Sequence, residues 1–213
     1  MTPFKKPFLL ISIFVLLLAC QNSREESYKN ILPEAKKKTE AFVIIDIQPF
    51  NDIPKEYVNY VYTELQKIYA HIEIKKPIAL PKQAYYAPRN RYRADSIIDY
   101  LSTITPKGHV TIGMTSKDIS TTKDKIKDYG IMGLGFQPGN ACVVSYFRLT
   151  KQNTLAQFFK LSCHELGHTQ GLPHCPVNTC FMRDAEGKNH FGEEKEFCPK
   201  CKAYLITKGW DLK

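Results

Sequence analysis

The stretch of sequence that constrains the fold most strongly is HELGHTQGLPH, residues 164–174. Residues four apart lie one above the other on a helix face, so His164 and His168 can direct two imidazole nitrogens at one ion. Gly171 can adopt a positive φ and end the helix, after which the chain returns His174 as a third ligand from another direction. Three protein ligands leave one position open, which is typical of catalytic rather than structural zinc. The stretch therefore predicts a catalytic zinc site on a helix.

Glu165 lies within this predicted site and has the chemistry of a general base. Its carboxylate projects beside the two helical histidines, where it can hold a water molecule. Zinc lowers the pKa of such a water toward about 7 and polarises the carbonyl under attack. The glutamate can take the water proton and pass it to the departing amine. These residues predict a zinc-dependent hydrolase of peptide bonds. The remaining histidines have no ligand-like spacing, and we expect structural roles for them: His71, His109 and His190.

Four cysteines follow the histidines as two pairs about twenty residues apart, the spacing of a closed structural zinc site with four thiolate ligands. Disulfides are the alternative, because a compartment outside the cytoplasm permits them. Cys142 and Cys163 are left over, and we expect either buried thiols or a disulfide, if a strand and a helix bring them together. The four candidate ligands are Cys175, Cys180, Cys198 and Cys201.

Strand and helix signals alternate between residues 41 and 170. The run 42–47 is nearly continuous in apolar residues, as expected for a strand covered on both faces. Asp52 and Pro54 predict the start of a helix that ends near His71, and Asp95 is expected to cap a second helix. Together these signals predict one α/β domain, residues 41–213, with a mixed, mostly parallel twisted sheet. Further strands are predicted at residues 72–74, 109–114, 131–136 and 141–147, and a long helix at about 153–170.

The N-terminus has the pattern of an export signal. Lys5 and Lys6 precede an apolar run over residues 8–19, which is shorter than the about 20 residues that a membrane-spanning helix needs. The junction Leu17-Leu18-Ala19-Cys20 resembles a bacterial lipobox, in which the cysteine is lipidated and becomes the new N-terminus. We therefore expect a signal peptide at residues 1–19, and a lipid anchor and polar tether at residues 20–40. An ordinary signal peptide beside an accidental Cys20 is the alternative.

These N-terminal features predict a lipid-anchored protein of the cell envelope. Gln21, in place of an aspartate, favours the outer membrane over the inner one. Loss of Lys5 and Lys6 lowers the net charge from +9 to about +7, which is mildly basic and not polycationic. We expect a peptide or protein substrate and a membrane as partners, a monomeric state, and no nucleic acid. At 213 residues, with 43% hydrophobic and 24% charged content, the chain is long enough for one sizeable core.

Read together, HELGHTQGLPHC, the step Cys180-Phe181-Met182, the terminal CPKC and the run VVSYFRL at residues 143–149 resemble the archaemetzincin family of metallopeptidases. The resemblance covers about residues 41–205 and implies a zincin-like α/β (α+β) fold with an active-site helix and a small C-terminal subdomain stabilised by zinc. It implies two zinc ions: one on His164, His168 and His174, the other on Cys175, Cys180, Cys198 and Cys201. It also implies that Met182 forms the Met-turn and that residues 131–136 form the upper edge strand of the cleft, with backbone contacts to substrate at Gly133, Leu134 and Gly135.

Two departures from that family pattern stand out. The gap from Met182 to Cys198 is a little shorter than usual, and the export signal would place a typically intracellular kind of enzyme outside the cytoplasm. The main alternative function is a non-catalytic zinc-binding lipoprotein of the envelope. Glu165 argues against it, because a binding module does not need a general base beside an open metal position.

Overall fold

The computed structural model describes residues 42–185 and 187–213. The expected signal peptide, the lipidated Cys20 and the tether at residues 20–40 therefore lie outside the described residues. Within these two ranges, no helix combines the length and the apolar character needed to cross a bilayer.

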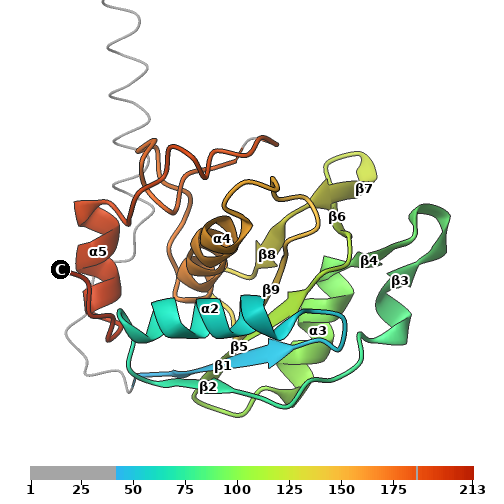
Figure 1. The fold of residues 1–213 in the computed structure, drawn as a ribbon, viewed down its shortest axis with the longest axis horizontal. Helices are drawn as coiled ribbons and strands as arrows, with labels where there is room; N and C mark the ends of the chain where they lie inside the picture. Colours follow the sequence, from blue (N-terminus) through green and yellow to red (C-terminus); the bar gives the residue numbers. More distant parts are fainter. Residues whose placement is uncertain (1–41, 186) are drawn as a thin grey trace, which may run out of the picture. The chain divides into compact units, whose positions relative to one another are not determined.

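The central element is a five-stranded sheet in the order β2-β1-β5-β9-β8 (Figure 1). Its strands β1 (Ile44–Pro49), β2 (Ile72–Ile74), β5 (His109–Thr115) and β9 (Ala141–Ser145) are parallel, whereas β8 (Gly133–Gly135) runs antiparallel along one edge. Strands β5 and β9 are buried almost throughout, as strands covered on both faces must be. The prediction of a mixed, mostly parallel sheet is confirmed.

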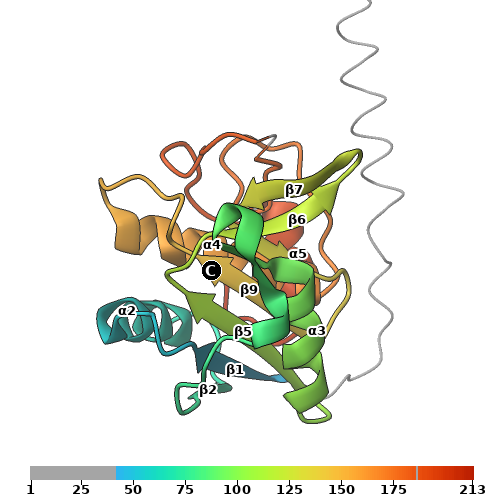
Figure 2. The same ribbon diagram turned by 90° about the vertical axis from the view of Figure 1, so that its right-hand side faces the viewer.

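Three helices cover the two faces of this sheet. Helices α2 (Lys55–Gln66) and α4 (Thr154–Thr169) lie side by side on one face, and α3 (Ala94–Ile104) lies on the other (Figure 2). Helix α3 buries Ile97, Ile98 and Leu101 in a core that also contains Phe50 and Val143. Its apolar residues recur at helical spacing, which is why the sequence predicts the helix well.

A second, four-stranded sheet has the order β3-β4-β6-β7 and was not predicted as a separate sheet. It consists of β3 (Tyr85–Tyr86), β4 (Arg91–Arg93), β6 (Ile119–Lys123) and β7 (Ile126–Ile131). The expected strand over residues 131–136 is in fact divided: Ile131 ends β7, where it pairs with Ile119, and Gly133 begins β8. Two short 3-10 helices, η1 (Lys82–Ala84) and η2 (Ala87–Arg89), precede β4.

Two predicted helix caps are wrong. Helix α2 has Pro54 at its N-cap, and Asp52 instead accepts hydrogen bonds from the Thr115 hydroxyl at 2.7 Å and the Ser116 amide at 2.6 Å. Helix α3 begins one residue before Asp95, whose carboxylate accepts a hydrogen bond from the Thr121 hydroxyl at 2.8 Å. In both cases the carboxylate accepts hydrogen bonds from residues in or next to a strand and not from the first amides of the helix. It therefore links the start of the helix to that strand and does not cap the helix.

The C-terminal region after α4 is mostly loop, and α5 (Pro199–Ile206) is its one helix among the described residues. Trp210 packs against Tyr69 and Phe197, with ring centroids 5.3 and 5.8 Å apart, and the Asp211 amide donates to the Ile68 carbonyl at 2.8 Å. These contacts attach the region to the end of α2. The predicted metal ligands outside α4 all lie in this region.

Candidate metal centres

His164 and His168 lie one turn apart on α4, and their Nε2 atoms are 3.0 Å apart. The Phe181 carbonyl accepts a hydrogen bond from His164 Nδ1 at 2.7 Å, and the Leu172 carbonyl accepts one from His168 Nδ1 at 2.8 Å. A carbonyl can only accept, so both protons lie on Nδ1 and each Nε2 carries a lone pair. Two lone pairs this close are stabilised by a cation between them.

His174 completes the group after the chain turns at Gly171, whose φ is +103°. The ligand atoms of the three histidines all lie within 4.8 Å of one another. Tetrahedral zinc with Zn–N bonds of about 2.0–2.1 Å separates its ligand nitrogens by roughly 3.3 Å, so the three side chains fit the ion. Burial lowers the pKa of His164 to about 3 and that of His168 to about 4, which favours the neutral form that binds metal.

Glu165 is 5% exposed and packs against the edge strand β8. Burial raises the pKa of its carboxyl to about 8. A Cβ at Gly133 would lie 2.4 Å from Glu165 Oε1, and a Cβ at Gly135 would lie 2.8 Å from the Glu165 backbone oxygen. Both glycines of β8 therefore make room for the active-site helix and its carboxylate, in addition to any contact with a substrate.

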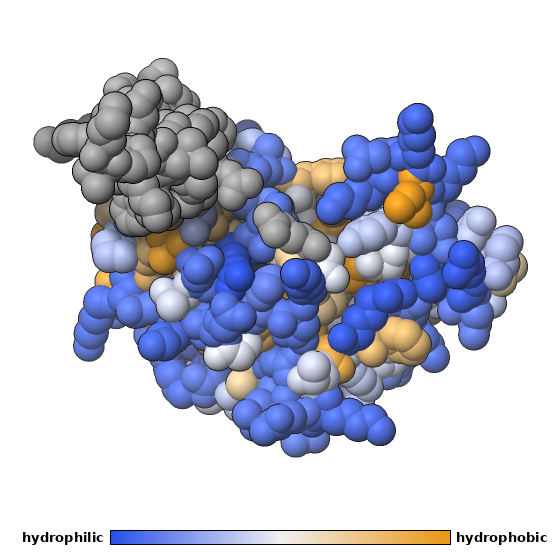
Figure 3. Space-filling view, turned by 90° about the horizontal axis from the view of Figure 1, so that it is seen from above, coloured by the Kyte–Doolittle hydropathy of each residue, from blue (hydrophilic) through white to orange (hydrophobic). Residues whose placement is uncertain are grey.

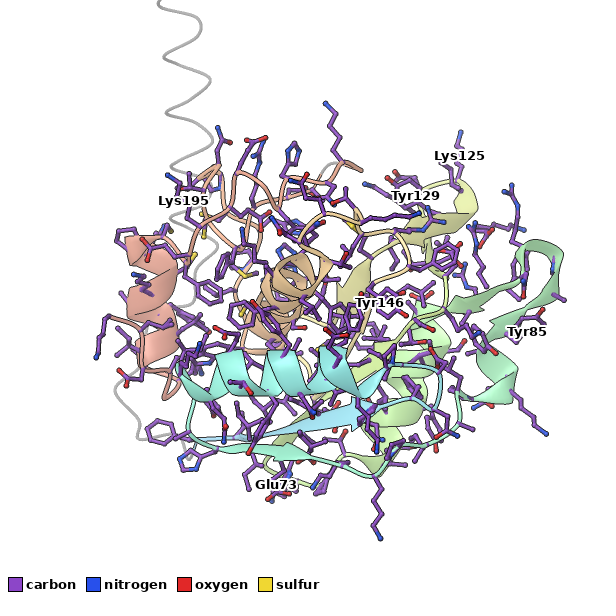
Figure 4. The ribbon with its side chains drawn as sticks, viewed as in Figure 1. Glu73, Tyr85, Lys125, Tyr129, Tyr146 and Lys195 are labelled. Carbon is purple, nitrogen blue, oxygen red and sulfur yellow. The ribbon has the colours of Figure 1, made fainter. Side chains whose placement is uncertain are left out.

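A cleft of about 630 Å³ borders the histidines and Glu165. Strands β7 and β8, helix α4 and the loop over residues 183–194 line it. Tyr129 of β7, labelled in Figure 4, is one of the lining residues. The face seen from above in Figure 3 is largely hydrophilic, with a few hydrophobic side chains between the charged ones. The cleft is large enough for several residues of a peptide.

The four cysteines of the C-terminal region form a second candidate metal site. All four are buried, and their sulfur atoms lie within 4.8 Å of one another. Cys175 Sγ and Cys198 Sγ are 3.7 Å apart, close to the roughly 3.8 Å that tetrahedral Zn–S bonds of about 2.3 Å require. The backbone amide of Cys198 donates a hydrogen bond to Cys180 Sγ at 3.2 Å. The four sulfurs thus fit a zinc ion. The structure has no disulfide among Cys175, Cys180, Cys198 and Cys201, so it does not have the alternative arrangement.

Met182 joins the two sites. It is fully buried, and its Sδ would be 2.4 Å from a Cβ at Gly167, so it lies directly against α4 within the histidine motif. The Cys175 amide donates to the Met182 carbonyl at 2.7 Å. The Met-turn role that the family resemblance implies for Met182 stays a prediction. The same short loop therefore carries a candidate histidine ligand, two of the cysteines and the methionine beneath the helix.

Cys142 and Cys163 are free and fully buried, and burial raises the pKa of both thiols well above its ordinary value. Of their two expected states, the structure has the buried thiols. His109 Nδ1 forms a hydrogen bond with Asp46 Oδ2 at 2.9 Å, as a structural histidine would. His190, expected to be structural, lines the cleft.

Two further cleft residues could not be found from the sequence. Arg148 follows β9 and is held by Asp118 through two hydrogen bonds of 2.7 and 2.9 Å. Glu194 is buried in the loop beside α4. Glu194 belongs to no motif with a recognisable spacing, and the family-like run at residues 143–149 does not show where the Arg148 side chain lies, so only the fold reveals that both residues line the cleft.

Comparisons with known proteins agree with this geometry. Residues 37–207 match the family described as peptidase family M54. The archaemetzincin of Archaeoglobus fulgidus is 31% identical over 162 residues, which are 74% of this chain and 95% of the relative. The archaemetzincin of Halobacterium salinarum is 29% identical over 171 residues, 74% of this chain and 96% of the relative.

Solved structures show the same fold. The crystal structure of archaemetzincin from Archaeoglobus fulgidus complexed with malonate has a TM-score of 0.65 at 27% identity and covers 76% of this chain and 99% of that one. The archaemetzincin from Methanopyrus kandleri has a TM-score of 0.67 at 25% identity, with coverage of 81% and 97%. The chain therefore belongs to peptidase family M54 and is a zinc metallopeptidase.

Proposed function

We propose that His164, His168 and His174 hold the catalytic zinc of this metallopeptidase and that Glu165 is the general base of peptide-bond hydrolysis. The observation that carries the proposal is the convergence of three imidazoles beside one buried carboxylate at the wall of an open cleft. When bound, zinc supplies Lewis-acid polarisation of a carbonyl and makes a water molecule more acidic. The residues of the chain supply the orientation and the proton transfer.

The environment of Glu165 suits its proposed role. Burial raises the pKa of the carboxyl to about 8, so the group is a stronger base than a solvated glutamate. Contact with Gly133 fixes the direction of the carboxylate. From there Glu165 takes the proton of the attacking water and delivers it to the nitrogen that leaves, so the base of the first step is the acid of the second.

The edge strand β8 is the proposed support for the substrate backbone. One side of β8 pairs with β9, and the strand lies at the end of its sheet and lines the cleft. An extended peptide can add to such an edge through main-chain hydrogen bonds. We propose that Gly133, Leu134 and Gly135 make these contacts and hold the scissile bond beside Glu165.

We propose a second, structural zinc on the four cysteines. The sulfur separations and the absence of a free position support it, because four protein ligands close a tetrahedral site. Its role is to stabilise the C-terminal loop, which has little secondary structure. The ligands are Cys175, Cys180, Cys198 and Cys201.

We also propose that the mature protein is anchored at the cell envelope through a lipid on Cys20, on the outer membrane, and acts there as a monomer. The lipobox-like junction and the polar residues after it support this proposal. Growth of the expressing bacterium with a radiolabelled fatty acid tests it: label on the wild type and none on Cys20→Ser is expected. Equal label on both chains would contradict it.

One experiment tests the catalytic proposal. The chain from residue 21 onward is purified, its zinc per chain is measured, and hydrolysis of a quenched peptide library is compared for wild type and Glu165→Gln. Activity in the wild type and its loss in a variant that keeps its metal are expected. Glu73→Gln, on the exposed side of β2 (Figure 4), is the matched control and should retain activity. Zinc in both chains without hydrolysis in either would favour the binding lipoprotein instead.

A further inference from the structure

Glu194 is a buried acid in the wall of the cleft that the proposed mechanism does not use. It is 5% exposed, and it lines the same cleft as His164 and Glu165. Its Oε2 is buried without a hydrogen-bond partner among residues 42–185 and 187–213. The loop that carries it can be followed in Figure 4 from the label of Lys195.

The two cations whose charges lower the pKa of Glu194 are engaged elsewhere. Lys160 Nζ donates to the backbone carbonyls of Phe191 and Glu194 at 2.6 and 2.5 Å, so it holds the loop through its main chain. Arg183 forms an ion pair of 2.6 Å with Glu193. Neither cation neutralises the Glu194 carboxylate at contact distance, although both lower its pKa at longer range.

An acid without a contact partner in this position is unfavourable unless something binds it. Burial raises the pKa of Glu194 to about 7, the ordinary sign that the charged form has lost its water. Buried polar groups are normally satisfied, and a strongly perturbed acid in a cleft is a candidate functional group. A positively charged ligand in the cleft would stabilise the ionised carboxylate and so replace the hydration that burial removes.

Glu194 also lies within reach of a substrate held at the histidines. Its backbone is tied to Lys160, which precedes His164 by one helical turn, or roughly 6 Å along α4. Leu161 and Phe191 also line the cleft, although each exposes only a small part of its side chain. These apolar edges can contact the hydrocarbon stem of a long basic side chain, whose head would meet the carboxylate.

We propose that Glu194 forms a subsite that binds a lysine or arginine side chain of the peptide substrate. The proposal rests on the proposed peptidase function and adds to it a preference in substrate class. A charge-assisted hydrogen bond of this kind contributes about 1.5–3 kcal/mol, which corresponds to a roughly 10- to 100-fold preference over a neutral side chain.

The test compares quenched peptides that carry arginine or the neutral isostere citrulline at each position around the scissile bond. At one position we expect the wild type to cleave the arginine peptide with a kcat/KM at least about tenfold higher. In Glu194→Gln that ratio should fall toward one while zinc per chain is unchanged. Glu196→Gln, an exposed neighbour that pairs with Lys202, should keep the ratio. A wild type without any arginine preference, or a Glu194→Gln enzyme that keeps it, would overturn the proposal.

Two additional measurements distinguish a side-chain subsite from a terminal-ammonium site and from a chain that does not cleave. Each peptide is also used with its N-terminus acetylated. If Glu194 binds a terminal ammonium and not a side chain, acetylation lowers kcat/KM for arginine and citrulline peptides alike, and Glu194→Gln removes that sensitivity to acetylation. Binding of the same peptides to zinc-loaded Glu165→Gln and Glu165→Gln/Glu194→Gln is measured by calorimetry. This measurement needs no hydrolysis, so it tests the subsite separately from the peptidase function. A wild type that cleaves no peptide would contradict the proposed peptidase function. Equal affinity of Glu165→Gln for arginine and citrulline peptides would contradict the proposed subsite.

Discussion

Replacing Gly133 by alanine tests how closely the proposed catalytic carboxylate of Glu165 depends on the edge strand. A Cβ at this position would lie 2.4 Å from Glu165 Oε1 and 2.8 Å from both Cδ and Cγ. Nonbonded carbon contacts settle near about 3.5–4.0 Å, so the atoms must separate by about 1 Å. Strand β8 is held by its pairing with β9, and the Glu165 side chain is therefore the part that moves.

The expected effect follows from that displacement. A misplacement of about 1 Å in an active site lowers the rate about 100-fold, equivalent to about 2.7 kcal/mol of transition-state stabilisation. We expect kcat/KM of Gly133→Ala on a quenched peptide to fall by that factor. Zinc per chain, measured by atomic emission, should stay at the wild-type level because the histidine ligands are not touched.

Two controls isolate the cause. Gly192 has nothing within 4 Å of an added Cβ, so Gly192→Ala should keep kcat/KM within about twofold of the wild type. In a Glu165→Gln background, Gly133→Ala should lower the residual rate little further, because both changes disable the same group. Wild-type activity in Gly133→Ala, or a loss accounted for by missing zinc, would refute the reasoning.

Three other changes have defined outcomes. The pKa of Glu194 is raised to about 7 from 4.5, so the fold favours its protonated form and loses stability as pH rises between these values. The free energy of unfolding of Glu194→Gln should therefore exceed that of the wild type by up to about 3 kcal/mol at pH 8 and by little at pH 4. Thermal unfolding measured across pH checks this, and a pH-independent difference would contradict it. Gly167→Ala places a Cβ 2.4 Å from Met182 Sδ, and overpacking of about 1–3 kcal/mol outweighs the about 1 kcal/mol of helix propensity, so its urea midpoint should fall. Cys201→Ser should lower zinc from two ions per chain to about one and lower the Tm; an unchanged metal count would exclude this cysteine as a ligand.

Local patterns predict the parts of this fold that are continuous in sequence. Strand β9 is largely an apolar run, in β5 apolar residues alternate with polar or small ones, and the repeats of α3 and α4 match a helix, so each element is readable without knowledge of its neighbours. The histidine motif is equally local, since helix geometry alone brings His164 and His168 together. For these elements the predicted and observed bounds agree within a few residues.

The second sheet depends on contacts between distant residues and is not readable in the same way. Its strand β4 is only three residues long and includes two arginines, which is a weak strand signal. Arg91 pairs with Asp118 at 3.0 Å and with Asp128 at 3.2 Å, and these partners lie on or next to other strands. Ion pairs across the sheet thus compensate for the poor local pattern, and no window of sequence shows them.

The division between β7 and β8 was missed for a related reason. Residues 131–136 form one uninterrupted, largely apolar and glycine-rich run, which reads as a single strand. In the structure Ile131 pairs with Ile119 in one sheet, and Leu134 pairs with Val143 in the other. An apolar run records that a segment is buried, but it does not record which sheet each half joins.

The cysteine group shows how a loop can complete a metal site that a helix begins. Helix α4 supplies two proposed ligands whose spacing is set by its own hydrogen bonds, whereas His174 comes from a loop that has none of this regularity. That loop is fixed at Cys175 directly after the third histidine and again at Cys180, two residues before Met182. The carbonyl that orients His164 belongs to Phe181, between those fixed points. The proposed zinc on the four sulfurs would remove conformational freedom of the segment, so His174, the orienting carbonyl and the methionine under the helix would reach their positions together.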